Sequence, residues 1–276
     1  MTELADFHVH PNYSIDATGT IRQFCDRALE VGLRHLCFTT HYDVNPRRTE
    51  QDGYWRYEGK RILISDRMLD IYFAEINRSR VFYEQFGLHI YRGLEIDYFP
   101  GVEADVERLR AKFPIDFAIL SVHCLNDIAI SDKREAPAYF LNKTVGEMAD
   151  DYFSLLRQAA ACPGYDSLGH LDYYVRYGRN YYGDEIDRIE IERFDEVFAF
   201  LRGGASGIEL NTSPYRYGSE NFHPGQDMLA RAIKAGVEVI SVGSDSHHPE
   251  KFGLGLKHAY DLLRQLDIEP KFPLVK

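Results

Sequence analysis

The feature that most constrains this chain is a regular alternation of short apolar segments with longer amphipathic ones. The short segments have the length and composition of buried β-strands, and the longer ones repeat their apolar residues with helical periodicity. Alternation of this kind specifies a parallel sheet with crossover helices. The predicted strands are residues 5–9, 35–39, 88–96, 117–122, 167–171, 207–210 and 238–242, and the predicted helices are residues 20–31, 66–86, 103–112, 144–161, 191–202, 226–235 and 257–266.

Seven such units predict an α/β barrel formed by one domain, residues 1–276, since barrels of this length are routinely single domains. An open, doubly wound sheet is the alternative, but side chains at the ends of six strands meet only on the rim of a closed barrel. Three polar connections without clear periodicity, residues 44–64, 124–143 and 173–190, are predicted to be loops near the strand ends. Residues 44–64 fit either a lid over a site or an ordinary surface excursion.

The histidines are placed unevenly along this pattern. Six of the eleven fall at predicted C-terminal strand ends, namely His8, His10, His41, His123, His170 and His247. The other five, for which a structural or surface role is favoured, are His35, His89, His223, His248 and His258. The pair His8-Val9-His10 alone is weak evidence, because histidine pairs also occur as hydrogen-bonded core residues. Six histidines on one rim indicate a metal site.

Carboxylates complete the set of donors at this rim. Asp16, Glu95 and Asp245 are expected beside the six histidines, which makes nine nitrogen and oxygen donors. Three divalent ions need about this number when each takes about three protein ligands and water fills the remaining positions. Nitrogen and oxygen donors serve zinc, iron and manganese alike, so the ligand types leave the metal open.

The order of these motifs resembles the polymerase and histidinol phosphatase (PHP) family over nearly the whole chain. The carrying motifs are His8-Val9-His10, Ser121-Val122-His123, Gly169-His170-Leu171-Asp172 and Gly243-Ser-Asp-Ser-His247, and the segment Glu209-Leu-Asn-Thr-Ser213 is similar to the monofunctional histidinol-phosphatase branch. The resemblance implies a distorted seven-stranded (β/α)7 barrel of the TIM type with a trinuclear metal site at its C-terminal rim. Thr40 stands where the family commonly has an acidic residue, and many members have histidine at the position of Asp16.

The resemblance also implies a distribution of ligands among the three ions, which would be zinc, iron or manganese. His8, His10, Glu95 and Asp245 would hold the first ion, and Glu95 would bridge to a second held by His123 and His170. The third ion would be held by Asp16, His41 and His247.

Such a site suits hydrolysis of a phosphate ester, because cations activate water and neutralise phosphate oxygens. Arg176 and Arg216 follow predicted strand ends and are candidate phosphate-binding and catalytic residues, and Asn211 and Ser213 are candidate substrate contacts. Asp16 or His247 would relay a proton to the leaving group. By resemblance the favoured substrate is L-histidinol phosphate, whose cationic groups could meet Asp43, Asp127 or Asp172.

Several other routes to phosphate chemistry lack their motifs. The chain has no GxxxxGK[ST] loop, no DxD pair and no cysteine followed by arginine at the spacing of a cysteine phosphatase. An amidohydrolase also begins with HxH on a barrel strand, but Glu95 stands where that class uses a lysine-derived carbamate. A family domain that has lost activity would be expected to lack ligands, and all nine are present.

The composition of the chain limits the classes of molecule that it is expected to bind. The net charge of −11, without a run of Lys or Arg, disfavours nucleic acid and favours a small phosphorylated metabolite, although nucleotides or oligonucleotide ends remain the alternative substrate class. Four scattered cysteines and the lack of a membrane-spanning or leader segment predict a cytoplasmic protein that is not bound to a membrane. The sequence does not indicate an oligomeric state.

Overall fold

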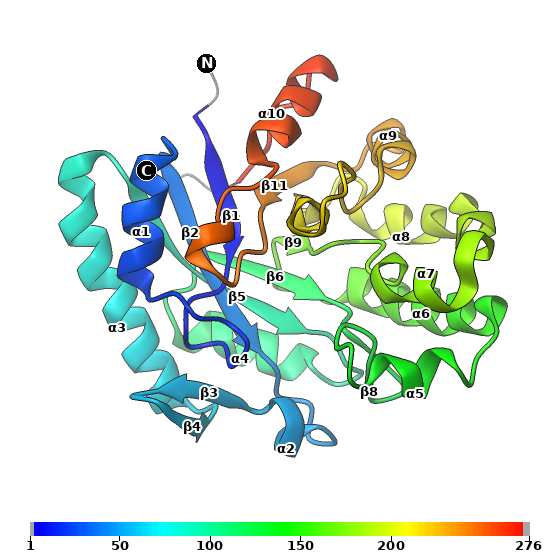
Figure 1. The fold of residues 1–276 in the computed structure, drawn as a ribbon, viewed down its shortest axis with the longest axis horizontal. Helices are drawn as coiled ribbons and strands as arrows, with labels where there is room; N and C mark the ends of the chain where they lie inside the picture. The colour runs from blue at the N-terminus through cyan, green and yellow to red at the C-terminus, as the bar shows by residue number, and fades with distance from the viewer. Residues whose placement is uncertain (1–2, 273–276) are drawn as a thin grey trace.

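The computed structural model describes residues 3–272, so the first two and last four residues of the predicted domain lie outside the described part. Seven parallel strands form one sheet in the order β1-β2-β5-β6-β9-β10-β11 (Figure 1). Their bounds are Ala5–Val9 (β1), His35–Tyr42 (β2), His89–Asp97 (β5), Phe117–Ser121 (β6), Ser167–Leu168 (β9), Gly207–Asn211 (β10) and Val239–Gly243 (β11). The sheet nearly closes where Val9 bridges Ser246 in parallel and the His10 amide donates to the Ser246 carbonyl at 2.9 Å. The predicted distorted seven-stranded barrel is thus confirmed.

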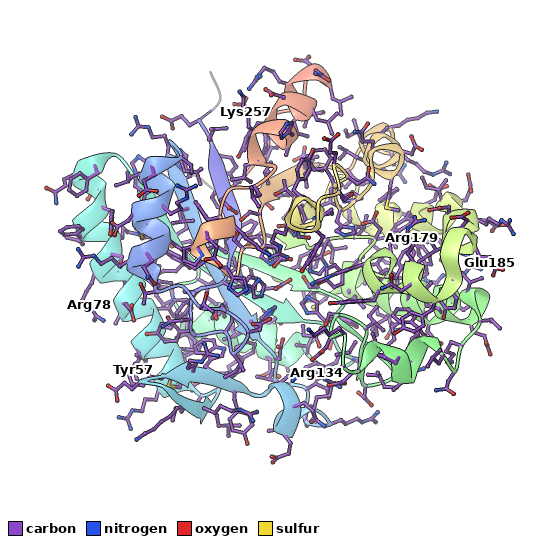
Figure 2. All side chains as sticks on the ribbon, viewed as in Figure 1. Tyr57, Arg78, Arg134, Arg179, Glu185 and Lys257 are labelled. Carbon is purple, nitrogen blue, oxygen red and sulfur yellow. The ribbon has the colours of Figure 1, made fainter. Side chains whose placement is uncertain are left out.

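Helices cover the outside of the sheet because each buries an apolar stripe on it. Helix α1 (Ile21–Glu30) is capped by Thr20, which forms a capping box with Gln23, and Thr144 and Glu147 form the equivalent box at α6 (Val145–Ala161). The other outer helices are α3 (Asp66–Tyr83), α4 (Glu103–Lys112), α8 (Phe194–Leu201), α9 (Gln226–Lys234) and α10 (Leu256–Gln265). Figure 2 shows the labelled side chains on α3, α7 (Val175–Tyr182) and α10 at the periphery of the molecule.

The connections predicted to be loops contain secondary structure, so that part of the prediction is wrong. Residues 44–64 form the short helix α2 (Thr49–Asp52) and a hairpin of β3 (Tyr54–Tyr57) and β4 (Lys60–Leu63). The hairpin turns at Glu58 and Gly59, whose φ angles of 49° and 74° suit the tight turn that joins two right-twisted strands. Residues 124–143 contain β7 (Cys124–Leu125), β8 (Ile128–Ala129) and α5 (Ala136–Phe140), and residues 173–190 contain α7 and the 3₁₀ helix η2 (Gly183–Arg188).

The bounds of some strands also differ from the predicted ones. Strand β2 extends to Tyr42, so that His41 lies inside it, and β9 is two residues long, so that His170 follows the strand end. The remaining 3₁₀ helices are η1 (Glu84–Phe86), η3 (Ile191–Arg193), η4 (Ser213–Tyr217) and η5 (Pro249–Lys251). All four cysteines are buried and free. Among residues 3–272, no helix is both long and apolar enough to cross a membrane.

Arg48 joins two of these rim connections. Its side chain is 4% exposed and pairs with Asp52 at 2.6 Å and with both oxygens of Glu135 at 2.8 and 3.1 Å. It also donates to the carbonyl of Asp127 at 2.7 Å, at the turn of the β7–β8 hairpin. One buried guanidinium therefore ties residues 44–64 to residues 124–143 beside the barrel mouth.

We expect Arg48→Ala to lower the free energy of unfolding by about 3 kcal/mol, because it removes a buried charge together with its hydrogen bonds and leaves two carboxylates without their partner. Arg47→Ala is the matched control. Arg47 is 78% exposed and, in the part of the chain that the structure describes, makes one ion pair, with Asp127 at 3.0 Å, so we expect a loss of about 0.5 kcal/mol or less. Urea unfolding of both variants measures the difference, and equal losses would show that the Arg48 network contributes little.

Candidate metal centre

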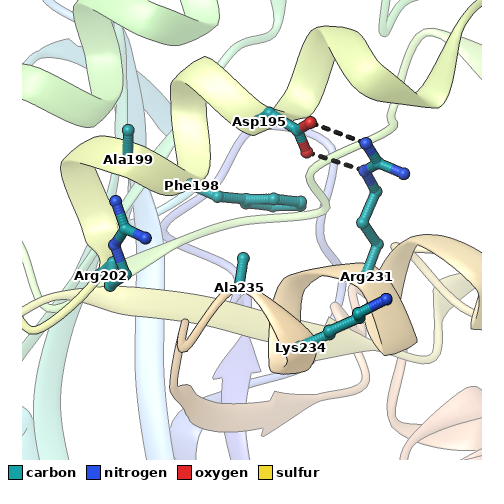
Figure 3. Close-up of a pocket in the computed structure, with 7 residues that line it drawn as sticks. All are labelled: Asp195, Phe198, Ala199, Arg202, Arg231, Lys234 and Ala235. Atoms are coloured by element: carbon teal, nitrogen blue, oxygen red, sulfur yellow. Dashed lines mark hydrogen bonds and ion pairs between the residues drawn. The ribbon is translucent and has the colours of Figure 1, made fainter.

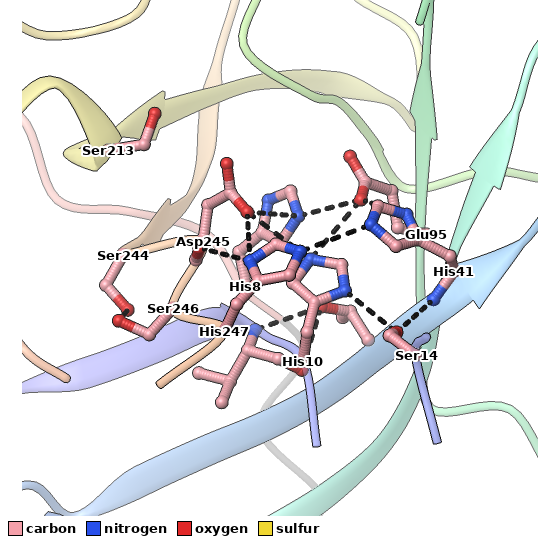
Figure 4. Close-up of polar contacts among 12 residues, drawn as sticks. His8, His10, Ser14, His41, Glu95, Ser213, Ser244, Asp245, Ser246 and His247 are labelled. Atoms are coloured by element: carbon pink, nitrogen blue, oxygen red, sulfur yellow. Dashed lines mark hydrogen bonds and ion pairs between the residues drawn. The ribbon is translucent and has the colours of Figure 1, made fainter. Parts of the chain in front are cut away.

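The nine predicted metal ligands lie together at the C-terminal rim of the barrel. Figure 4 shows six of them with their side chains pointing toward one another: His8, His10, His41, Glu95, Asp245 and His247. Eight of the nine side chains are at most 21% exposed, whereas Asp16 is 63% exposed. Residues that are far apart in the sequence meet here because parallel strands bring all their C-terminal ends to one edge.

The side chain of Asp6 helps to join the two strands at which the barrel closes. The buried carboxylate of Asp6 accepts from the amide of His8 at 3.1 Å and from the amide of Ser244 at 2.9 Å. These bonds tie β1 to the segment after β11 that carries Asp245. Asp245 itself has a φ of 52°, a left-handed conformation that aspartate tolerates better than most residues. The sharp turn directs its carboxylate toward His10, with 3.4 Å between Oδ1 and Nε2.

Glu95 lies at the centre of the cluster, and its two oxygens face different histidines. Oε2 is 3.1 Å from His8 Nε2, 3.3 Å from His10 Nε2 and 3.1 Å from His41 Nδ1. Oε1 is 3.3 Å from His123 Nε2 and 3.0 Å from His170 Nε2, and it accepts a hydrogen bond from Ser121 at 2.7 Å. A carboxylate in this position can bridge two cations, one on each oxygen.

The atoms that face one another are not satisfied by hydrogen bonds. His8 Nε2, His10 Nε2, His41 Nδ1 and Glu95 Oε2 are buried, and none has a partner in hydrogen-bond geometry. Buried polar atoms are nearly always hydrogen-bonded, so four buried atoms without partners around one point indicate that they bind a ligand such as a metal ion. Within the described residues, four groups of three donors could each hold an ion: His8/His10/Glu95, Glu95/His123/His170, His10/His41/His247 and His41/Asp43/His123. The donor set fits divalent zinc, iron or manganese.

The predicted third group is spread around His247. Asp16 Oδ2 lies 3.2 Å from His247 Nε2 and 3.9 Å from His41 Nε2, and the two histidine Nε2 atoms are 3.3 Å apart. His10 is a further neighbour, because its ring is stacked on that of His247 with 4.1 Å between the centroids. Asp16 is therefore near both predicted partners, but it lies on the exposed side of the cluster.

Burial and charge together set the protonation of the cluster. Burial disfavours the charged form of Glu95, but His8 and His123 outweigh it and hold the pKa of Glu95 well below its usual range. Burial also disfavours the charged form of His41, yet the Glu95 carboxylate raises the pKa of His41 to about 9. For His10, burial and the neighbouring His247 both lower the pKa, well below the ordinary value. An ionised carboxylate thus faces histidines of mixed protonation, and a cation would displace the protons.

A second set of acidic side chains, which the sequence analysis did not assign to the site, orients the histidines from behind. Glu209 Oε1 is 2.7 Å from His8 Nδ1, and Asp97 Oδ1 is 3.4 Å from His123 Nδ1. Contacts of this kind fix the ring so that Nε2 faces the metal. A Cβ at Gly243 would lie 2.2 Å from the Glu209 carboxylate, so glycine is needed there for Glu209 to reach His8. The signal in the sequence was a carboxylate inside the otherwise apolar predicted strand of residues 207–210.

We expect Glu209→Gln to weaken metal binding about 10- to 100-fold, because the neutral amide holds the His8 ring less firmly and lowers the basicity of its Nε2. Competition with a chromogenic chelator measures the affinity. Glu196→Gln on α8 is the control, since Glu196 is 67% exposed and pairs only with Arg157 among the described residues. An unchanged affinity in Glu209→Gln would mean that packing alone orients His8.

The two predicted arginines differ in their surroundings. Arg216, on η4, has a 7% exposed side chain and pairs with Asp245 Oδ2 at 3.1 Å, and it also lies 3.4 Å from His247 Nδ1. Its Nε is buried without a partner. Arg176, on α7, lies over the rings of Tyr173, Tyr177 and Tyr217 and donates to the hydroxyls of Tyr173 and Tyr217. Arg216 therefore contacts two of the candidate ligands directly, whereas Arg176 is one layer removed.

Asn211 and Ser213 lie beside the cluster, but their contacts are mostly internal. The Asn211 amide donates to Glu209 Oε2 at 3.0 Å, and its oxygen accepts from the Ser213 amide at 2.8 Å. Asn211 is fully buried and Ser213 is 2% exposed. These contacts indicate that Asn211 supports the Glu209–His8 pair, and its role as a substrate contact stays a prediction.

The three acidic residues considered as contacts for the cationic groups of the substrate differ in whether they are already paired. Asp172 is engaged by His223 at 2.6 Å and by the amide of Gly225 at 2.9 Å, and Asp127 is engaged by Asn45 and Arg47. Asp43 instead has a buried Oδ1 without a hydrogen-bond partner. It belongs to one of the four donor groups, with His41 and His123. Of the three, Asp43 is the carboxylate left free toward the cluster.

The chain is similar to a known family, to named proteins and to a solved structure. A family model described as the PHP domain matches residues 6–213. A probable histidinol-phosphatase of Deinococcus radiodurans is 30% identical over 273 residues, which cover 96% of this chain and 95% of that protein. The histidinol-phosphatase of Lactococcus lactis subsp. lactis is 29% identical over 265 residues, which cover 94% of this chain and 90% of that protein.

A solved structure of a related protein has the same fold. The histidinol phosphate phosphatase of Lactococcus lactis, complexed with zinc, L-histidinol and phosphate, superimposes with a TM-score of 0.76 at 25% identity, over 97% of this chain and 95% of that chain. The family model, the full-length relatives and this structure all lead to one assignment. This chain belongs to the PHP domain family.

Proposed function

We propose that this protein is a metal-dependent phosphoric monoester hydrolase that converts L-histidinol phosphate to L-histidinol and phosphate. The observation that carries the proposal is Glu95, whose two oxygens each face a separate group of histidines at the barrel rim. Two cations bridged by a carboxylate are the arrangement that in-line displacement at phosphorus uses. The relatives named as histidinol-phosphatases, aligned over nearly the full chain, support the choice of substrate.

The ligands would be divided among three divalent ions. His8, His10, Glu95 and Asp245 would hold the first, Glu95, His123 and His170 the second, and Asp16, His41 and His247 the third. The zinc in the related Lactococcus structure supports zinc as one occupant, with iron and manganese as alternatives. Bound here, the ions would lower the pKa of a coordinated water and neutralise the phosphate oxygens.

The side chains of the protein itself would bind the phosphate and move the proton. Arg216 carries a fork of donors beside Asp245 and His247, from which it could turn toward a phosphate oxygen. Arg176 would contribute from the next layer, released from Tyr173 and Tyr217. The 3.2 Å contact between Asp16 and His247 suits transfer of a proton to the leaving alkoxide.

A small substrate is favoured over nucleic acid. The chain has a net charge of −11 and no basic run, whereas proteins that bind nucleic acid neutralise phosphates with Lys and Arg. Asp43, with its unpaired oxygen beside the histidines, would suit a cationic group such as the ammonium of histidinol.

The test is metal analysis followed by phosphate release from a panel of esters: L-histidinol phosphate, glycerol and sugar phosphates, phosphotyrosine, nucleoside monophosphates and a short single-stranded oligonucleotide. We expect a strong preference for L-histidinol phosphate that is lost in His8→Ala and Asp245→Ala. Activity confined to nucleotides or to the oligonucleotide would transfer the function to the alternative substrate class. A metal-loaded protein that released no phosphate from any ester would contradict the proposal.

A further inference from the structure

Among the nine candidate ligands, Asp16 is the one least constrained by packing against other residues. Its side chain is 63% exposed, whereas the other eight candidates are at most 21% exposed. Its neighbour Ile15 is also exposed, at 36%. A buried ligand is fixed by the atoms around it, but an exposed side chain on a loop loses conformational freedom when it binds an ion. The position of Asp16 therefore depends on how its backbone is held.

Arg56, on strand β3, holds that backbone on both sides of Asp16. Its guanidinium donates to the carbonyl of Ala17 at 2.7 Å and to the carbonyl of Ile15. Its own amide donates to the carbonyl of Tyr13 at 2.8 Å, so β3 runs beside the loop. Within residues 3–272, no carboxylate forms an ion pair with Arg56. The Arg56 guanidinium donates to the two peptide carbonyls that flank Asp16. It can therefore position the Asp16 carboxylate.

The same strand reaches a second candidate ligand of the third ion. The indole of Trp55 donates to the carbonyl of His41 at 2.5 Å. Trp55 is 1% exposed and packs edge-on against Tyr13 and Tyr72, with ring centroids 5.9 and 5.3 Å away. Neighbouring residues of β3 are therefore attached to the Asp16 loop and to His41.

The remaining member of this group is attached to the far end of the loop. The amide of Thr18 donates to the carbonyl of His247 at 2.9 Å, and the Thr18 hydroxyl is 2.8 Å from Nδ1 of His248. The Asp16 loop is thus held on one side by the segment after β11 and on the other side by β3. Removing the Arg56 side chain would leave the Thr18 contacts and the backbone bond to Tyr13, but the two carbonyls that flank Asp16 would lose their donor.

We propose that the β3–β4 hairpin is a clamp that assembles the third cation site, with Arg56 as the residue that positions Asp16. The inference rests on the proposed metal centre and adds to it a segment that contributes no ligand. Outer residues that orient ligands are expected to change metal affinity by about 10- to 100-fold. Arg56 should act on the third ion alone, because it touches none of the residues assigned to the other two.

The experiment compares Arg56→Ala with Arg61→Ala. Arg61 is the cross-strand partner of Arg56 in the hairpin register, donates to the carbonyls of Glu50 and Gln51 at 3.2 and 3.4 Å, and contacts no ligand loop. Metal per chain is measured by mass spectrometry after dialysis against a weak chelator, and the affinity of the most weakly held ion by titration. Asp16→Ala is the reference for loss of the ligand itself.

We expect Arg56→Ala to retain one ion fewer than the wild type, or to bind its weakest ion about 10- to 100-fold less tightly, while Arg61→Ala matches the wild type. The double variant Arg56→Ala/Asp16→Ala should lose no more metal than Asp16→Ala, because both changes act on one site. Equal metal content and affinity in Arg56→Ala and the wild type would overturn the clamp. So would a loss spread over all ions in a chain that keeps its circular dichroism spectrum.

Arg56→Lys covers the case in which Arg56→Ala does not fold. One ammonium can reach one of the two carbonyls, so we expect an intermediate affinity for the weakest ion in a folded chain; an affinity equal to that of the wild type would count against the clamp. None of these readouts uses a substrate. A wild type that binds metal but does not hydrolyse L-histidinol phosphate would contradict the proposed function and leave the clamp standing.

Discussion

Glu95→Gln is expected to lower kcat for phosphate release about 10⁴-fold, the largest effect of any single change in this protein. Glutamine keeps the shape of the side chain but removes the negative charge and one of the two oxygens. Five histidine nitrogens lie within 3.3 Å of the Glu95 carboxylate. One amide oxygen can face only one of the two groups, so the bridge between two cations would be lost.

Two measurements check this prediction: phosphate release from L-histidinol phosphate and metal content per chain. We expect at least one ion to be lost along with the activity. Glu107→Gln on α4 is the control, because Glu107 is exposed and lies on the outer helix layer. If Glu95→Gln retained both its metal and more than about a tenth of the wild-type kcat, the bridging role would be wrong.

Arg216→Lys should lower kcat/KM about 10²- to 10³-fold, the second largest effect. Lysine keeps the positive charge but not the planar fork that matches two phosphate oxygens. Arg216 is also paired with Asp245 at 3.1 Å. Burial disfavours the charged form of Asp245, but the Arg216 guanidinium outweighs it and is the leading reason that the pKa of Asp245 lies well below its usual range. The substitution therefore tests two roles, phosphate binding and support of Asp245.

Metal content separates the two roles of Arg216. If the residue grips phosphate, Arg216→Lys keeps its ions and shows a raised KM together with a lowered kcat. If it mainly supports Asp245, the ions are lost and activity returns when metal is added in excess. Arg179→Lys is the control, since Arg179 pairs with Asp187 on the outside of the barrel. Wild-type kinetics in Arg216→Lys would exclude both roles.

The pocket between α8 and α9 is a contrasting surface feature (Figure 3). It is lined by Asp195, Phe198, Arg231 and neighbouring residues, and Arg231 forms two hydrogen bonds of 2.7 Å with Asp195. Its single carboxylate, Asp195, is paired with Arg231, whereas the rim cluster leaves four buried donor atoms unpaired. The chemistry of the protein is therefore expected at the rim rather than in this pocket.

The sequence was sufficient for the barrel and for the membership of the rim cluster. Strand–helix alternation has only a few topological solutions, and a residue at the end of a strand in a parallel barrel must lie on the rim. His8, Glu95 and Asp245 could therefore be assigned to one place without any knowledge of packing. The periodicity of the helices and the cap at Thr20 are local properties, which neighbouring residues determine.

The sequence was insufficient for everything that depends on contacts between distant segments. The hairpin of residues 54–63 was predicted to be a loop, because residues 44–64 are polar and aromatic without clear periodicity and its two strands are only four residues long. Glu209 was seen only as part of a motif, since nothing near it in the chain indicates His8, which is 201 residues away.

Local chemistry determined which elements form and which residue types reach the rim. Tertiary structure alone decided which oxygen of Glu95 faces which histidines, which carboxylates stand behind them, and which strand holds the loop of Asp16. The physical reason is that a strand end specifies a position to within a few ångströms, whereas coordination needs tenths of an ångström. That precision comes from buried side chains and backbone carbonyls contributed by the whole barrel.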